Sequence, residues 1–320
     1  MYTMTDKKQW QGRIDSTTNA NSFRLHQEVK RVPINDVIAS EKPQAGIVGF
    51  ICDEGVRRNQ GRLGAAHGPN ALREALSSLP WTFQDGQQIV DVGNVLCLNH
   101  ALEEAQQELG EIVEILRNKK AKCIVLGGGH ETLYGHYLGV RASLPKDAKI
   151  GIINIDAHFD LRSYEVQPSS GTMFRQILEQ DPHTDYFVLG IQRYGNTNEL
   201  FEKARELQVE FVLEDDLTAE NHTQIMNQLQ QFMDSHDYIL LTLCMDVLNA
   251  AFAPGVSAPS PFGLEPKTVR SIIQKVTSHP HTHSFDICEV NPSLDENGRT
   301  VKLGAYFIYE ALNNLIRGNG

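Results

Sequence analysis

The chain has 320 residues, of which 41% are hydrophobic and 22% are charged, so it has ordinary globular composition and enough length to bury a large core. Its 40 acidic and 29 basic residues give a formal net charge of −11, which argues against partners such as duplex nucleic acid or an anionic membrane surface. A small molecule is therefore the expected partner.

The first 40 residues are predicted to be a polar N-terminal extension, and residues 41–320 to be a single domain without an internal linker. The N-terminal sequence lacks an apolar segment of the signal-peptide kind, and no apolar run in the chain is long enough to cross a bilayer. Scattered cysteines embedded in apolar runs indicate buried free thiols in a reducing compartment; they are Cys52, Cys97, Cys123, Cys244 and Cys288. Together these features predict a cytoplasmic protein.

Short apolar runs alternate with helical patterns along the chain. The runs predict strands at 45–51, 88–93, 122–127, 149–155, 186–191, 209–213, 238–245 and 283–290. Apolar stripes at helical spacing predict helices at 69–79, 101–120, 197–207, 218–234, 265–277 and 304–317. Most strands are continuously apolar, as in strands buried on both faces. This pattern predicts a three-layer αβα sandwich with a mainly parallel central sheet.

In such a sheet the ligand site lies beyond the carboxyl ends of the strands, so the polar residues that follow each run are the candidates. The first is His130, which follows a strand and the turn Gly127–Gly129. His130 and His136 lie six residues apart, so they do not form the zinc-protease motif, whose histidines lie one helical turn apart. The stretch is not a phosphate-binding loop either, because no Gly-Lys-Ser/Thr follows.

A second strand is followed by DAHFD, in which Asp156, His158 and Asp160 alternate and would point the same way from an extended chain. Asp246 follows a third strand, with Cys244 on the same face, and Glu289 follows a fourth. Ionisable groups that converge in this way need a cation between them. This mixture of imidazoles and carboxylates suits a divalent metal of the Mn type.

These motifs resemble those of the arginase superfamily of ureohydrolases. The matching stretches are GGGH at 127–130, DAHFD at 156–160, TLCMDVLNAAFAPG at 242–255 and EVNP at 289–292. Other stretches are most similar to members that hydrolyse the linear amidine N-formimidoyl-L-glutamate to L-glutamate and formamide in histidine degradation; they lie at 10–15, 53–73, 169–177, 190–197 and 253–259. The resemblance implies an arginase-like fold, two Mn(II) ions per chain and a homo-oligomer.

The resemblance also implies roles for the metal ligands. His130 and Asp160 would bind one Mn(II), His158 and Asp246 would bind the other, and Asp156 would bridge both. Cys244 departs from the pattern, because it stands where the arginases have a second bridging aspartate. It could be a protonated thiol that leaves the metals more electropositive, a thiolate ligand that favours softer ions, or a small packing residue beside a loosely held second metal.

For catalysis, the hypothesis is that a metal-bridging hydroxide attacks the amidine carbon and is oriented by Asp160. Glu289 would accept hydrogen bonds from the cationic formimidoyl nitrogens. Arg175 is the first candidate for binding the substrate carboxylates, and the weaker candidates are Arg58, Arg62, Arg162 and Arg193. The histidines of HPHTH at 279–283 precede a strand and are predicted to lie in a surface loop at the wrong end of the sheet.

Two alternatives stay open at this point. One is another hydrolase of the same superfamily that acts on agmatine or a guanidino acid. The other is a metal-deficient protein with a binding role, which the cysteine at position 244 brings into consideration.

Overall fold

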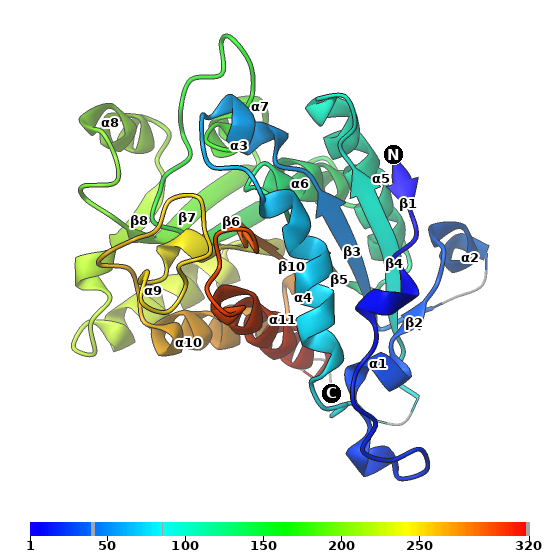
Figure 1. Cartoon of the computed structure of the whole chain (residues 1–320). Coiled ribbons are helices and arrows are strands. Elements are labelled where there is room, and N and C mark those ends of the chain that lie inside the picture. The colour runs from blue at the N-terminus through cyan, green and yellow to red at the C-terminus, as the bar shows by residue number, and fades with distance from the viewer. Residues whose placement is uncertain (40–41, 85, 318–320) are drawn as a thin grey trace.

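The computed structural model of the chain describes residues 1–39, 42–84 and 86–317. Within these residues it forms one sheet covered by helices on both faces, so the predicted three-layer sandwich is confirmed (Figure 1). The predicted boundary between the N-terminal extension and the main domain falls at residues 40–41, outside the described residues, and the division into domains stays a prediction. No helix in the described ranges is long and apolar enough to cross a membrane.

The strands of the sheet follow the order β1-β4-β3-β5-β10-β9-β6-β7-β8, with β2 paired to β4. All named pairs are parallel except β1 with β4. The strands are β1 (Tyr2–Thr3), β2 (Lys30–Arg31), β3 (Ala45–Ile51), β4 (Ile89–Leu96), β5 (Lys122–Leu126), β6 (Ile150–Ile155), β7 (Thr184–Ile191), β8 (Glu210–Leu213), β9 (Tyr238–Cys244) and β10 (Thr282–Cys288). Every strand predicted from an apolar run is therefore present.

The helices form two layers, one on each face of the sheet. They are α1 (Leu25–Glu28), α2 (Ile34–Ala39), α3 (Glu54–Arg58), α4 (Gly68–Ser77), α5 (Leu102–Asn118), α6 (Thr132–Ala142), α7 (Met173–Gln180), α8 (Asn198–Glu206), α9 (His222–Asp234), α10 (Pro266–Thr277) and α11 (Arg299–Arg317). Residues of α4, α9, α10 and α11 share one buried apolar cluster, and residues of α5, α6, α7 and α8 share the other.

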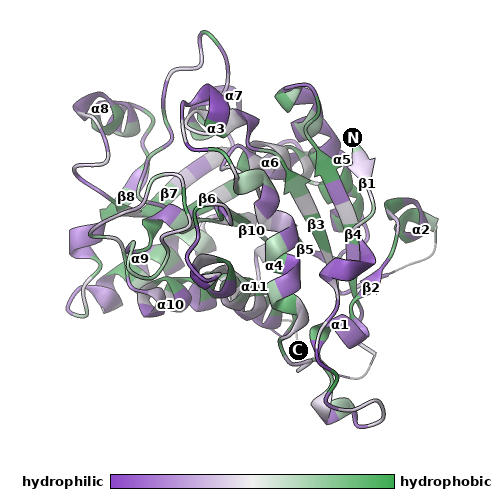
Figure 2. Ribbon diagram, viewed as in Figure 1, coloured by the Kyte–Doolittle hydropathy of each residue, from purple (hydrophilic) through white to green (hydrophobic). Residues whose placement is uncertain are grey.

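Side chains along a central strand alternate between the two clusters. On β5, Ile124 belongs to the cluster with α11, whereas Cys123 and Val125 belong to the cluster with α5. Successive side chains of a strand point to opposite faces, so a strand between two helical layers must be apolar on both. The central strands accordingly form a hydrophobic band in the interior (Figure 2).

The sequence patterns predicted no conformation for the N-terminal extension, which contains α1 and α2, and they also did not predict α3, α6 and α7. In α6 the cause is the pair of glycines that lower its helical signal, Gly135 and Gly139. A Cβ on Gly139 would lie 2.3 Å from the carbonyl oxygen of Gly110 on α5, so these glycines permit close packing of the two helices. The glycines lower the helix propensity of α6 but allow its close contact with α5. No local sequence pattern indicates that contact.

Four neighbouring strands, β5, β10, β9 and β6, end at the same edge of the sheet. Their registers pair Leu126 with Ile287, Cys288 with Cys244, and Ile155 with Leu243. The polar residues predicted to follow these strands are therefore brought side by side.

Candidate metal and substrate site

His130 is carried to the sheet edge by the glycine turn after β5. A Cβ on Gly128 would lie only 1.8 Å from the carbonyl oxygen of Cys52, so the turn passes against the end of β3 in a way that requires glycine. His130 itself is buried, with 2% of its surface exposed. The turn thus holds the His130 ring in the protein interior at the strand ends and not in a solvent-exposed loop.

The DAHFD motif brings two carboxylates to the same ring. The Nδ1 atom of His130 lies 3.0 Å from Oδ2 of Asp156 and 3.1 Å from Oδ2 of Asp160. The alternating pattern predicted an extended chain through the motif, but the chain turns at Asp160, which has a positive φ of 51°. This turn, and not simple alternation, directs Asp160 toward His130.

The second imidazole, His158, faces two carboxylates in the same manner. Its Nδ1 atom lies 3.2 Å from Oδ2 of Asp246 and 3.5 Å from Oδ1 of Asp156. Asp246 is supplied by a short 3₁₀ turn, Met245–Val247, that follows β9 directly. Asp156 therefore faces both histidines with different oxygens.

Two of the three groups of potential ligand atoms among the described residues share Asp156, and the third consists of His130, Asp286 and Cys288. His130, Asp156 and Cys244 make one group, and Asp156, His158 and Asp246 make the other; within each group the ligand atoms lie within 4.8 Å of one another. Among the described residues, the buried Oδ1 of Asp246 has no hydrogen-bond partner, and the buried Nδ1 of His130 faces only the carboxylates of Asp156 and Asp160. Buried atoms of this kind normally have partners, so their convergence fits a pair of divalent cations held by nitrogen and oxygen ligands.

Protonation states at the site reflect this concentration of charge. Burial and the carboxylates of Asp156 and Asp246 raise the pKa of the Cys244 thiol well above its usual value. Burial would also raise the pKa of Asp156, but the adjacent rings of His130 and His158 lower it overall. A thiolate at position 244 would consequently form only against a nearby cation.

A buried polar chain lies on the far side of the His130 ring. Nε2 of His130 lies 3.1 Å from the hydroxyl of Thr242, which donates to Oδ1 of Asp286 at 2.6 Å. Oδ2 of Asp286 pairs in turn with Nδ1 of His136 at 2.6 Å. Because the threonine hydroxyl donates to Asp286, it accepts from Nε2, which leaves the Nδ1 lone pair of His130 directed at the carboxylates.

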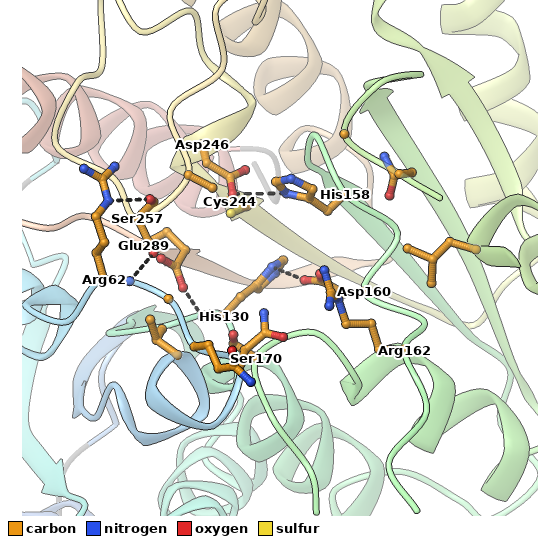
Figure 3. Close-up of a pocket in the computed structure, with 18 residues that line it drawn as sticks. Arg62, His130, His158, Asp160, Arg162, Ser170, Cys244, Asp246, Ser257 and Glu289 are labelled. Carbon is orange, nitrogen blue, oxygen red and sulfur yellow. Dashed lines mark hydrogen bonds and ion pairs between the residues drawn. The ribbon is translucent and has the colours of Figure 1, made fainter. Parts of the chain in front are cut away.

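A cavity of about 280 Å³ opens over these groups, lined by His130, His158, Asp160, Cys244, Asp246 and Glu289 (Figure 3). Its walls include Asn59, Gln60, Arg62, Arg162 and Ser170, none of which the sequence analysis gave a primary role. These five residues come from separate parts of the chain and share no sequence pattern. They meet only because the connections after the strands converge at this edge of the sheet.

The candidate arginines differ in whether their guanidinium groups already have partners within the protein. Arg175, the first candidate from the sequence, lies on α7, pairs with Glu179 at 2.8 Å and does not line this cavity. Arg62 lines the cavity, but its guanidinium donates to the carbonyl oxygens of Ser257 and Val256. For Arg162, no described residue accepts a hydrogen bond from the guanidinium. Arg162 is therefore the cavity arginine best able to bind an anion.

Glu289 lies at the cavity beside His130, and Figure 3 shows it on the other side of that ring from Arg162. Its Oε1 accepts a hydrogen bond from the backbone N–H of His130 at 3.0 Å, and its backbone has a positive φ of 65°. Burial and the neighbouring carboxylates of Glu131 and Asp246 raise its pKa well above the usual value. A non-glycine residue held in this conformation is often functional, and a cationic ligand would suit this carboxylate.

A mainly parallel αβα sandwich with this cluster at four strand ends agrees with the family resemblance, and the chain belongs to the arginase family, which matches residues 43–313. A protein named formimidoylglutamase from Lysinibacillus sphaericus is 78% identical over 321 residues, covering 100% of both chains. Another of that name from Geobacillus kaustophilus is 51% identical over 313 residues, covering 98% of this chain and 97% of that one.

Solved structures share the fold. The formimidoylglutamase from Bacillus subtilis superposes with a TM-score of 0.82 at 19% identity, covering 97% of this chain and 98% of that chain. A Trypanosoma cruzi formiminoglutamase, described with Mn2+2, gives a TM-score of 0.77 at 23% identity and covers 90% and 99% respectively. At such identities the likeness concerns the fold.

Proposed function

We propose that this protein hydrolyses N-formimidoyl-L-glutamate to L-glutamate and formamide at a pair of Mn(II) ions. The observation that carries the proposal is the full-length identity of 78% to a protein named formimidoylglutamase. The site adds independent support, because two of its ligand groups share Asp156 and its cavity holds both the carboxyl group of Glu289 and the guanidinium of Arg162. A substrate with a cationic amidine at one end and carboxylates at the other matches that polarity.

The residues that would hold the metals are those predicted from the sequence. His130 and Asp160 would serve one ion, His158 and Asp246 the other, with Asp156 between them and Cys244 in reach of the first group. Bound Mn(II) would supply Lewis-acid chemistry by lowering the pKa of a water nucleophile toward neutrality. The mixed imidazole and carboxylate set is appropriate for such an ion.

The remaining roles belong to side chains of the cavity. Asp160 would accept a hydrogen bond from the attacking water and so orient it toward the amidine carbon. Glu289 would accept hydrogen bonds from the planar amidinium nitrogens, an arrangement in which a buried carboxylate is matched by opposite charge. Addition of water to the amidine carbon and cleavage of its bond to the glutamate nitrogen release formamide and glutamate.

Arg162 replaces Arg175 in this proposal as the partner of a substrate carboxylate. Its guanidinium lines the cavity and has no acceptor among the described residues, whereas Arg175 is paired with Glu179. Arginine presents a planar fork of donors that binds a carboxylate through two hydrogen bonds. Agmatine has no carboxylate, so a free arginine at this wall favours an amidine acid over that alternative.

A substrate panel tests the proposal. Mn(II)-loaded protein is incubated with N-formimidoyl-L-glutamate, agmatine and arginine, and release of glutamate, putrescine and urea is followed. We expect turnover of formimidoylglutamate alone. Turnover of agmatine or arginine instead would select a related ureohydrolase, and no turnover with metal bound would leave the binding-protein alternative.

Three broader expectations accompany this proposal. A cytoplasmic location rests on the scattered cysteines and the N-terminal sequence, whereas a place in histidine degradation and assembly into a homo-oligomer rest on the family resemblance. Size measurement of the purified protein in solution tests the last.

A further inference from the structure

Glu131 follows the predicted metal ligand His130 directly and is completely buried. Its side chain leaves the metal cluster and reaches the start of α3, where Oε1 accepts a hydrogen bond from the backbone N–H of Gly55 at 2.9 Å. The thiol of Cys52 lies 3.5 Å from the same oxygen. The proposed reaction makes no use of this carboxyl group.

The space for this contact is made by two glycines. A Cβ on Gly55 would lie 2.7 Å from both Cβ and Cδ of Glu131, and a Cβ on Gly129 would lie 2.1 Å from its Oε2. Gly55 is not held in a left-handed conformation, so its backbone would accept alanine. The absence of a side chain at position 55 therefore reflects the presence of Glu131, and the two residues fit each other.

Gly55 is also the start of the segment that forms one wall of the cavity. Its carbonyl oxygen accepts from the N–H of Asn59 at 2.9 Å, and the N–H of Gly61 donates to the carbonyl of Val56 at 2.8 Å. Val56 and the residues 59–62 all line the cavity. A displacement of Gly55 would thus be passed to Asn59 through a single hydrogen bond.

We infer that Glu131 is a positioning residue that ties the metal side of the site, at His130, to the substrate wall formed by α3 and residues 59–62. Its carboxyl oxygen fixes Gly55, and Gly55 fixes Asn59, so the wall keeps a set distance from the metal ligands. The outer side of α3 is held separately, because Arg58 bonds to Glu54 and Glu103. Loss of the Glu131 contact therefore loosens the wall without releasing the helix.

The kinetic test rests on the proposed function. Glu131→Ala should raise KM for formimidoylglutamate about tenfold or more, because a small misplacement of positioning groups weakens binding strongly. It should leave Mn(II) per chain unchanged and kcat within about threefold of wild type. Glu131→Gln should restore KM, since its amide oxygen can accept from Gly55. An unchanged KM in Glu131→Ala, or a loss of metal in proportion to activity, would overturn the inference.

A second test does not need the activity. Gly55→Ala should lower the urea midpoint of unfolding in the wild-type background, and this loss should become smaller in Glu131→Ala, which removes Cδ and Oε2 and leaves only the contact with Cβ. Gly151→Ala is the matched control at the amino end of β6, where a Cβ would meet Phe232 and His236. Its effect should add to that of Glu131→Ala. Additive effects for Gly55→Ala as well would contradict the fit, whether or not the wild type turns over the substrate.

Discussion

Cys244 is the side chain that sets how many anionic ligands face the predicted metal pair. It is buried at the end of β9, with its sulfur in one ligand group with His130 and Asp156. The three interpretations drawn from the sequence, a thiol, a thiolate or a packing residue, differ in what the sulfur contributes to metal binding. Geometry places it within reach of an ion, and a measurement of metal retention separates the interpretations.

We predict that Cys244→Ala lowers Mn(II) affinity by at least about tenfold, because loss of a contact to a metal costs no less than loss of an outer partner. Cys244→Asp should retain metal at least as well as wild type, since it adds a hard carboxylate ligand. Metal per chain after dialysis, measured by mass spectrometry, reports both. Cys123→Ala, a buried thiol on β5, is the control. Equal metal content in all four proteins would make Cys244 a packing residue.

The candidate ligands could be predicted from their positions along the chain. Each of them follows an apolar run that forms a strand, and the parallel strands end at one edge of the sheet; the ligands are His130, Asp156, His158 and Asp246. Glu131 and Thr242 were not predictable, because their roles depend on contacts with Gly55 and Asp286 that no local pattern specifies. Spacing identifies what lies at the strand ends but not what holds it there.

At the scale of elements, Arg162 and Arg175 have different surroundings, because Arg162 lies in the connection after β6 and Arg175 lies on helix α7. Arg162 lies in the irregular segment that leaves the DAHFD turn, and its side chain reaches the cavity. Arg175 lies in the first turn of α7, where helical spacing brings it to Glu179. Arg175 was the first candidate because its stretch, 169–177, follows the DAHFD motif closely along the chain, but the sequence patterns did not predict helix α7, which begins at Met173.

We predict that Arg162→Met raises KM for formimidoylglutamate by about tenfold to a hundredfold, the effect expected from loss of one charge-assisted hydrogen bond or ion pair. Arg175→Met should leave KM close to the wild-type value, because its loss removes only a contact with Glu179 on the helix surface. Steady-state kinetics at saturating Mn(II) compare the two variants. The opposite ranking would restore Arg175 as the carboxylate partner.

At the scale of the whole molecule, the carboxyl and amino ends of the strands carry different kinds of residues. The carboxyl ends of the strands carry the metal and substrate groups, whereas the amino end of β10 carries the HPHTH histidines away from them, as predicted. These histidines are not a simple surface loop, however. His279 is buried, and Nδ1 of His283 lies 2.7 Å from Nζ of the buried Lys122 on β5.

Burial, with Lys122 and Arg117 nearby, lowers the pKa of His283 to about 3 from the usual value of about 6.5. The unfolded chain therefore takes up a proton at this ring as pH falls below about 6.5, while the folded chain does not until about pH 3. Stability from the neutral ring is present above this window and is lost as pH falls through it. One such group changes the free energy of unfolding by at most about 1.4 kcal/mol per pH unit.

His283→Asn should reduce this loss, because its side-chain oxygen can accept from Lys122 but does not titrate. We expect the variant to be no more stable than wild type at pH 7 and to gain on it steadily toward pH 4.5, as measured by urea unfolding at each pH. Lys122→Met removes one cause of the lowered pKa and should weaken the pH dependence in part, since burial of the ring persists. A constant difference between His283→Asn and wild type across this range would show that the ring takes up its proton at the same pH in the folded and unfolded chains, so that burial and Lys122 do not lower its pKa.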